Sequence, residues 1–441
     1  MSKRSIVITM LVVAASLLVW LMPVALRAIP SRYVAAYLPE PIQTLSVREH
    51  ADVLPTTVAS ADTDDLLVAR PVIASPESTL SPPIVTRQER SDDRGASAPA
   101  TPTPLPSPTS SPTAIPIPPS QRLEGFNHIF QTWNNCGPAT LAMALTYFGL
   151  GHSQEQTAKL LKPDPEDRNV SPYEIVDYVH SETDLAAISR TNGDLDTLRR
   201  LIANDVPVIV ELGIDPPGEY RWMGWYGHYL LVVAYDDQTE QVWVYDSWFG
   251  TSEVPGENAD DEGRMISYRE LDRYWRQFNR NYIAFYQPRQ ETLVQQIIGP
   301  AMDDENMWRA SLERAQTELA AEPDNPFLWF NLGTNYNAVG DHERAASAFD
   351  QARSIGLPWR MLWYQFGPYE AYYEVGRYED ILLLADTTLK DRPYFEESYY
   401  YKGLALQALG DHNEAERMFR RAVRFNPNFT PAVDELAAFG D

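Results

Sequence analysis

The pattern of hydrophobic and polar positions divides the chain into four parts. An uncharged apolar run extends from Ile6 to Leu26, and a polar, proline-rich stretch follows it. Helix and strand patterns then alternate, and from about residue 305 onward apolar residues recur only at helical spacing. The pattern therefore predicts a membrane segment, a linker, an α+β domain and an all-α domain, at residues 1–30, 31–121, 122–289 and 290–441.

The first apolar run is long enough to cross a bilayer, which needs about 20 residues. Lys3 and Arg4 precede this run, and they predict a signal anchor whose N-terminus lies in the cytoplasm. The globular domains are then expected to be membrane-anchored and extracytoplasmic. A cleaved signal peptide, cut after Ala36, is the alternative, and it would make the protein a secreted one.

Residues 31–121 have the composition of a tether. The stretch Thr101–Ser120 contains 8 prolines in 20 positions, mixed with serine and threonine. Such a run favours extended polyproline II structure and cannot form a packed core. We expect a disordered linker that holds the globular part of the protein away from the membrane.

Within the α+β region, Cys136 begins a predicted helix. Asn134-Asn135 can cap this helix, Gly137-Pro138 fits its first turn, and Ala139–Phe148 is rich in helix formers. A thiol at a helix N-terminus feels the positive end of the helix dipole, which lowers its pKa and favours the nucleophilic thiolate. Cys136 is the one cysteine of the chain, which excludes an intramolecular disulfide and any multi-thiolate metal site.

Two predicted strands carry a histidine and an aspartate at matching ends. His228 begins the apolar strand HYLLVVAY, and Asp246 ends the next strand, QVWVYD. In an antiparallel pair these two positions lie at the same end of the hairpin. This arrangement suits an imidazole that is oriented by a carboxylate, as thiol and serine nucleophiles require.

Together these features form an ordered set of motifs. The motifs are Gln131-x4-Cys136-Gly137-Pro138-Ala139, a Pro-Val-Ile-Val strand, Gly227-His228-Tyr229 and the aspartate Asp246 after the next strand. The set resembles the C39-like peptidases, a group of papain-like cysteine peptidases. One departure is Ser247 after the aspartate, where many relatives have proline.

The resemblance implies a papain-like α+β fold and a role for each motif residue. Cys136 would be the nucleophile, and His228 would act first as general base and then as general acid. Asp246 would orient His228, and Gln131 would donate its side-chain amide to the oxyanion together with a backbone N–H near Cys136. No metal or organic cofactor is implied.

Three aromatic residues precede the histidine closely. Trp222, Trp225 and Tyr226 could wall a substrate cleft, or they could pack a loop over the sheet. The sequence leaves both interpretations open.

The C-terminal part contains an internal repeat. Trp329, Gly333, Ala345, Phe349 and Ala352 match Tyr399, Gly403, Ala415, Phe419 and Ala422, each 70 residues later, which is two periods of about 35. This pattern resembles the tetratricopeptide repeat. The predicted copies are 326–359, a degenerate 360–393, and 396–429, with capping helices at Met307–Ala320 and Pro431–Phe439. The resemblance implies protein binding on the concave face, and a spacer without a partner is the alternative.

Charge and composition narrow the choice of function. The net charge of −25 argues against a nucleic-acid partner, because phosphate binding needs clustered lysine and arginine. We therefore expect a membrane-tethered thiol peptidase that acts on a peptide or protein, with repeats that recruit the substrate or a partner protein. The alternatives are an inactive, peptidase-fold scaffold and a thiol acyltransferase.

Overall fold

A computed structural model describes residues 21–22, 25–26, 53–56, 117–215, 224–252 and 262–439. The expected anchor at 1–30 and the linker at 31–121 lie almost wholly outside these residues. Among the residues that are described, no helix is long and apolar enough to cross a membrane.

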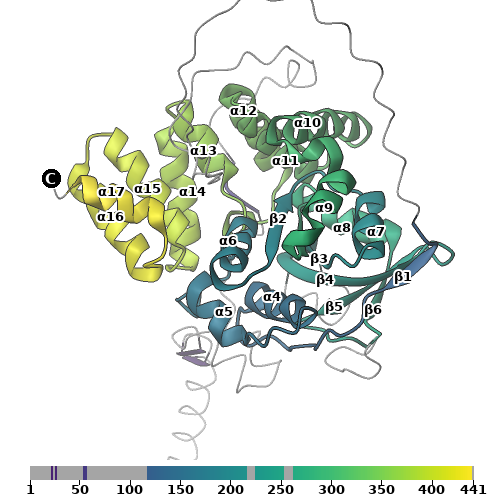
Figure 1. Ribbon diagram of the computed structural model, residues 1–441. Coiled ribbons are helices and arrows are strands. Elements are labelled where there is room, and N and C mark those ends of the chain that lie inside the picture. The colour runs from purple at the N-terminus through teal and green to yellow at the C-terminus, as the bar shows by residue number, and fades with distance from the viewer. Residues whose placement is uncertain are drawn as a thin grey trace, which may run out of the picture.

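An antiparallel seven-stranded sheet forms the centre of the first domain (Figure 1). The strands are β1 (Ser120–Arg122), β2 (Ala186–Arg190), β3 (Val208–Ile214), β4 (Tyr226–Asp236), β5 (Gln241–Asp246), β6 (Arg264–Ser267) and β7 (Tyr282–Tyr286). Their order is β2-β7-β3-β4-β5-β6, and β1 pairs with Ala234 to Asp236 at the end of β4. The pairing of β4 with β5 shifts its register between Val232 and Ala234. The expected hairpin of β4 and β5 is therefore present.

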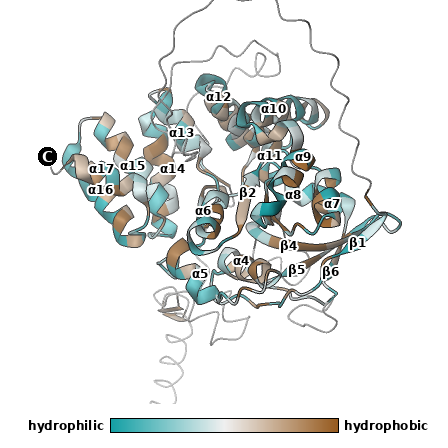
Figure 2. Cartoon of the chain, viewed as in Figure 1, coloured by the Kyte–Doolittle hydropathy of each residue, from teal (hydrophilic) through white to brown (hydrophobic). Residues whose placement is uncertain are grey.

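Helices cover both faces of this sheet. They are α4 (Cys136–Thr146), α5 (Gln154–Leu161), α6 (Pro172–Glu182), α7 (Leu195–Ala203), α8 (Tyr268–Trp275) and α9 (Glu291–Ile298). On one face α4 and α6 pack against Ile209 and Leu231, and on the other α7, α8 and α9 pack against Val210 and Val232. Because side chains alternate along a strand, covering both faces requires the continuous apolar runs that the sequence shows and that colour β4 brown in Figure 2.

The second domain consists of paired helices that form an arc beside the first (Figure 1). They are α10 (Asp304–Ala321), α11 (Pro326–Ala338), α12 (His342–Ile355), α13 (Gly367–Glu374), α14 (Tyr378–Asp391), α15 (Glu396–Ala408), α16 (His412–Phe425) and α17 (Thr430–Ala438). Glycines allow the paired helices to approach closely, because a Cβ atom on Gly333 would lie 2.7 Å from the ring of Phe349. The same contact recurs between Gly403 and Phe419, which explains the repeated positions in the sequence.

The middle repeat departs from its neighbours at its first helix. Eleven residues, 356–366, separate α12 from α13, whereas four residues, 322–325 and 392–395, make the corresponding links before α11 and α15. The expected copy at 360–393 therefore begins its helix late, at Gly367. Pro368 fits this start, because it lies in the first turn of α13, where a missing N–H leaves no helical hydrogen bond unmade.

The domain boundaries differ from the expected ones. β1 begins at Ser120, before the expected start at 122. Val294 and Ile298 of α9 belong to the core of the sheet, so the first domain extends past the expected end at 289. The repeat core begins with Leu312 of α10. The periodicity of α9 is helical, and sequence alone could not reveal which core this helix joins.

Buried polar contacts join the two domains. Asn279 Nδ2 donates to Asn335 Oδ1 at 2.7 Å, and Arg280 Nη2 pairs with Glu318 Oε1 at 2.7 Å. Asn169 Nδ2 likewise donates to Glu397 Oε1 at 2.8 Å. Since buried polar groups require partners of fixed geometry, these contacts hold the domains in one orientation.

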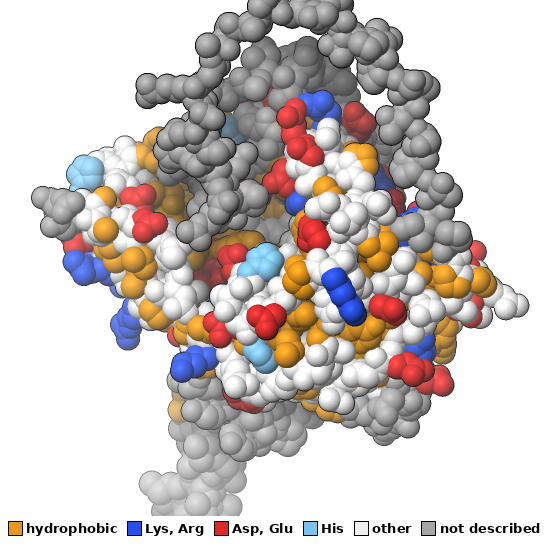
Figure 3. Space-filling model, in the orientation of Figure 1, with side chains coloured by type: hydrophobic (Ala, Val, Ile, Leu, Met, Phe, Trp, Pro, Cys, Tyr) orange, Lys and Arg blue, Asp and Glu red, His pale blue; other side chains and the backbone are white. Residues whose placement is uncertain are grey.

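Acidic side chains are scattered between other residue types on the face shown in Figure 3. The large negative charge of the chain is therefore not concentrated in one patch of that face. This distribution is typical of a solvated acidic surface.

Residues 53–56, within the expected disordered linker, are docked on the repeat domain. Val53 forms an isolated bridge with Pro358, and Leu54 N donates to Leu357 O at 2.9 Å. Leu54 is only 1% exposed and belongs to the repeat core. Arg353 Nε donates to the carbonyl of Pro55 at 2.8 Å. At these four residues the expectation of a linker without packing is wrong, because Leu54 packs within the core of the repeat domain.

We expect Leu54→Ala to lower the free energy of unfolding of the full-length protein by about 2–5 kcal/mol, the usual cost of truncating a buried leucine. The neighbour Val53 is 43% exposed. Val53→Ala, which is the matched control, should stay within about 0.5 kcal/mol of wild type. Urea unfolding followed by tryptophan fluorescence measures both variants. Equal effects of the two substitutions would contradict the docking of Leu54.

Candidate active site

Cys136 is the first residue of α4, the helix that packs on the centre of the sheet. Residues from Gly137 to Leu145 are buried, whereas Cys136 itself is half-buried. Asn135 occupies the expected N-cap position and its carbonyl accepts the N–H of Ala139, but its side chain makes no capping hydrogen bond. Asn134 adopts a left-handed conformation, with φ of 57°, and its amide donates to the carbonyl of Glu166 at 3.2 Å. These contacts shape the loop that leads into the thiol.

The pairing of β4 with β5 brings His228 and Asp246 together. Asp246 lies directly opposite Leu230, and His228 is two residues before Leu230, on the same face of the strand. Diagonal neighbours of this kind are within reach of long side chains. His228 Nε2 lies 2.9 Å from Asp246 Oδ1, with both side chains almost completely buried.

The carboxylate of Asp246 has a full set of donors. Oδ1 also accepts hydrogen bonds from the backbone N–H groups of Trp248 and Phe249, at 2.8 and 3.0 Å. Oδ2 pairs with Arg264 Nη1 of β6 at 3.0 Å. Burial alone would raise the pKa of Asp246, but the positive charges of His228 and Arg264 outweigh it and lower the pKa to about 2. Asp246 is therefore ionised throughout the physiological range.

His228 is held in its charged form by this carboxylate. Burial would lower the pKa of His228, but the charge and hydrogen bond of Asp246 raise it to about 10. Because Nε2 faces Asp246, the other ring nitrogen, Nδ1, is the one left for the nearby thiol of Cys136. The ring of Tyr226 lies edge-on to the imidazole, with the ring centroids 5.9 Å apart.

The thiol of Cys136 has a lowered pKa. Burial raises the pKa, but the hydrogen bond and positive charge of His228 outweigh it, with further contributions from the N–H of Gly137 and the charge of Lys162. The position of the thiol at the start of α4 acts in the same direction. Cys136 and His228 therefore favour a thiolate–imidazolium pair.

Gln131 is oriented by the residue that follows Asp246. Its backbone N–H donates to the carbonyl of Ser247 at 2.7 Å, and the hydroxyl of Ser247 donates to Gln131 Oε1 at 2.8 Å. The side-chain NH₂ of Gln131 is thereby left as a donor. A proline at position 247 could not make this contact, which gives a physical meaning to the departure from the family pattern.

The three aromatic candidates have different environments. Trp222 lies outside the described residues. Trp225 is 9% exposed, and its ring packs against Phe278, Phe327 and Tyr364 at the junction of the two domains. Of the two interpretations, packing rather than a cleft wall therefore applies to Trp225. Tyr226 lies next to the imidazole of His228.

Tyr364 comes from the repeat domain and was not predicted for the site. A Cβ atom on Gly227 would lie 3.1 Å from its ring, so Tyr364 covers the start of β4. Burial raises the pKa of Tyr364 to about 12, and Cys136 is close enough to contribute to this shift. The long link 356–366 was the signal that could have identified this residue, since it interrupts the repeat period.

Two further features lie apart from these residues. No group of three or more histidine, cysteine, aspartate or glutamate side chains in the described part of the chain could hold a metal ion.

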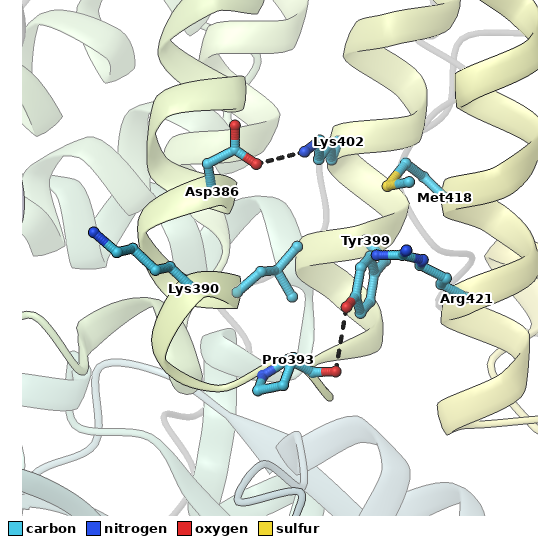
Figure 4. A pocket seen from close by; sticks show the side chains of 8 residues that line it. Asp386, Lys390, Pro393, Tyr399, Lys402, Met418 and Arg421 are labelled. Carbon is cyan, nitrogen blue, oxygen red and sulfur yellow. Dashed lines mark hydrogen bonds and ion pairs between the residues drawn. The ribbon is translucent and has the colours of Figure 1, made fainter. Parts of the chain in front are cut away.

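A pocket of about 410 Å³ opens between helices α14, α15 and α16 of the repeat domain (Figure 4). It is lined by Asp386, Leu389, Lys390, Pro393, Tyr399, Lys402, Met418 and Arg421.

Comparisons with known protein families support both predicted domains. Residues 118–283 match the Peptidase_C39 like family, and residues 396–429 match the tetratricopeptide repeat. The expected order of a C39-like peptidase domain followed by these repeats is confirmed. No curated protein matches the chain.

Two solved structures are similar to parts of the chain. A putative C39-like peptidase from Bacillus anthracis is 15% identical with a TM-score of 0.29, and the match covers 38% of this chain and 96% of that one. The structure of MamA is 15% identical with a TM-score of 0.27, covering 30% of this chain and 77% of that one.

We expect Asp246→Asn to lower the pKa of His228 from about 10 toward its ordinary value of 6.5, because the substitution removes the neighbouring negative charge. The ring-nitrogen chemical shifts of His228, followed by NMR during a pH titration, measure this change. Asp184→Asn changes the net charge equally at an exposed position and should leave the titration unchanged. A pKa of His228 that is the same in Asp246→Asn and wild type would contradict the electrostatic account.

Proposed function

Because residues 118–283 form a C39-like domain, we propose that the protein is a thiol peptidase that uses Cys136, His228 and Asp246. Cys136 is the nucleophile, and His228 donates and accepts the protons of the reaction. Asp246 orients His228 and stabilises its protonated form. The observation that carries the proposal is the buried 2.9 Å contact between His228 and Asp246, and the thiol of Cys136 lies close enough to His228 for the imidazolium charge to lower its pKa.

The reaction proceeds in two halves. The Cys136 thiolate attacks the carbonyl carbon of a peptide bond, and the side-chain amide of Gln131 and the backbone N–H of Cys136 stabilise the oxyanion. The C–N bond breaks as the imidazolium of His228 gives its proton to the leaving amine, which leaves a thioester on Cys136. His228 then takes a proton from water, and the resulting hydroxide attacks the thioester carbon. The C–S bond breaks, which releases the acid and restores the Cys136 thiolate beside the protonated His228.

The repeats and the N-terminal segment extend the proposal. The repeats recruit the protein substrate or a partner protein, since helical repeats build extended binding surfaces. The apolar segment at 1–30 anchors the chain in a membrane, with both domains on the extracytoplasmic side. The supporting features are the Lys3/Arg4 pair and the proline-rich stretch between the apolar segment and the domains.

The pH dependence of Cys136 alkylation by iodoacetamide tests the proposal. A lowered thiol pKa means that the thiolate persists as the pH falls, so the rate should remain high well below pH 7, whereas an ordinary thiol titrates near about 8.5. His228→Ala removes the partner charge, and the rate near pH 6 should drop at least about tenfold.

His412→Ala provides the matched control, because His412 is an exposed residue of the repeat domain. Its alkylation profile should match wild type. Alkylation that is absent, or identical in wild type and His228→Ala, would mean that no thiolate–imidazolium pair exists. The non-enzymatic scaffold would then replace the peptidase as the better account.

A further inference from the structure

In the segment between α5 and α6, the guanidinium of Arg168 lies close to two tryptophan rings. Its carbon is 5.3 Å from the ring centroid of Trp133 and 5.1 Å from that of Trp363. Trp133 belongs to the loop that leads into Cys136, and Trp363 belongs to the link 356–366 of the repeat domain. Each domain therefore supplies one of the two tryptophan rings that contact this cation.

No carboxylate neutralises Arg168 directly. It forms no hydrogen bond or ion pair with any residue in the described part of the chain, and its Nε is buried without a partner. Burial lowers the pKa of Arg168, which reflects the cost of removing this charge from water. A half-buried cation of this kind, which has lost part of its hydration, is stabilised when an anion supplies the missing acceptors.

Two other arginines surround the same tryptophan. Arg360 and Arg392 lie 5.2 and 5.5 Å from the ring centroid of Trp363. Arg392 pairs with Asp391 at 2.9 Å, and Glu166 is the other carboxylate close to Arg168. Three arginines thus gather around Trp363 beside two carboxylates, in a chain whose net charge is −25.

This cluster borders the reaction centre and reaches solvent. Tyr364 is close enough to both Cys136 and Arg168 to be affected by each, and its ring covers Gly227, the residue before His228. Trp133, Arg168 and Tyr364 are each half-buried. Tyr364 is therefore a neighbour of both the thiol and the guanidinium.

We propose that Arg168, with Arg360 and Arg392, binds a carboxylate that the substrate carries within one or two residues of the bond cleaved at Cys136. This inference rests on the proposed peptidase function and specifies its substrate class. The flat guanidinium, fixed between two rings, presents its N–H groups in the paired geometry that a carboxylate accepts. The carboxylate belongs either to the substrate's C-terminus or to an aspartate or glutamate side chain.

Affinity labelling of Cys136 in the full-length protein tests the proposal. The probes are iodoacetylglycine and iodoacetyl-β-alanine, each compared with its uncharged amide. In wild type at least one acid should react about tenfold faster than its amide, which corresponds to about 1.4 kcal/mol of added binding. Arg168→Gln should bring this ratio close to one, and Arg168→Lys should restore part of it.

Arg289→Gln is the matched control, since Arg289 is exposed and lies outside the cluster, and its ratio should equal that of wild type. Arg392→Gln should lower the ratio partly. Acid and amide probes that react equally fast in wild type would overturn the carboxylate site and leave the thiol peptidase intact. If neither acid nor amide reacts, the proposed function fails first.

Two peptide pools identify the source of the carboxylate. In the first pool, each peptide is tested with a free C-terminus and with an amidated one. In the second pool, each peptide is tested with aspartate and with asparagine at the same position. Cleavage lost on amidation assigns the C-terminus, and cleavage lost on the exchange to asparagine assigns an acidic side chain. Cleavage that is unchanged by both alterations would contradict the proposal.

Discussion

The buried contact between His228 and Asp246 is the constraint on which the site depends. Removing a carboxylate from water costs several kcal/mol unless donors replace the lost hydration. Here the donors come from His228, from two backbone N–H groups after β5, and from Arg264 of β6. These contacts form only if β4, β5 and β6 pair in the observed register. The helices on both faces of the sheet stabilise that register, because they bury the apolar side chains of the strands.

The repeat domain contributes residues to the surroundings of the candidate site in the first domain. The link 356–366 replaces the opening turns of one repeat helix, and its Tyr364 covers the strand end that carries His228. Arg360 of the same link donates to the carbonyl of Trp225 at 3.2 Å. A degenerate repeat thus has a physical purpose, because the residues that break its pattern are the ones that contact the peptidase-like domain.

The sequence predicted the parts of the site that depend on local pattern. Cys136 at a helix start, and His228 and Asp246 at matching strand ends, follow from the periodicity of the elements that carry them. Arg264, Ser247 and Arg168 could not be predicted, because each acts through a contact with a segment distant in the chain, and the irregular middle repeat was the one signal for Tyr364. Leu54 was missed because the overall composition of a linker does not reveal a single residue that packs into a distant core.

Intact-protein mass spectrometry of the full-length chain, quenched in acid during incubation with an unstructured peptide pool, tests the central claim most directly. The account predicts cleaved peptides together with an acyl adduct on wild-type protein, and no adduct when Cys136 is replaced by alanine. Intact peptides and an unmodified Cys136, in protein whose thiol still reacts with iodoacetamide, would contradict the assignment of a thiol peptidase.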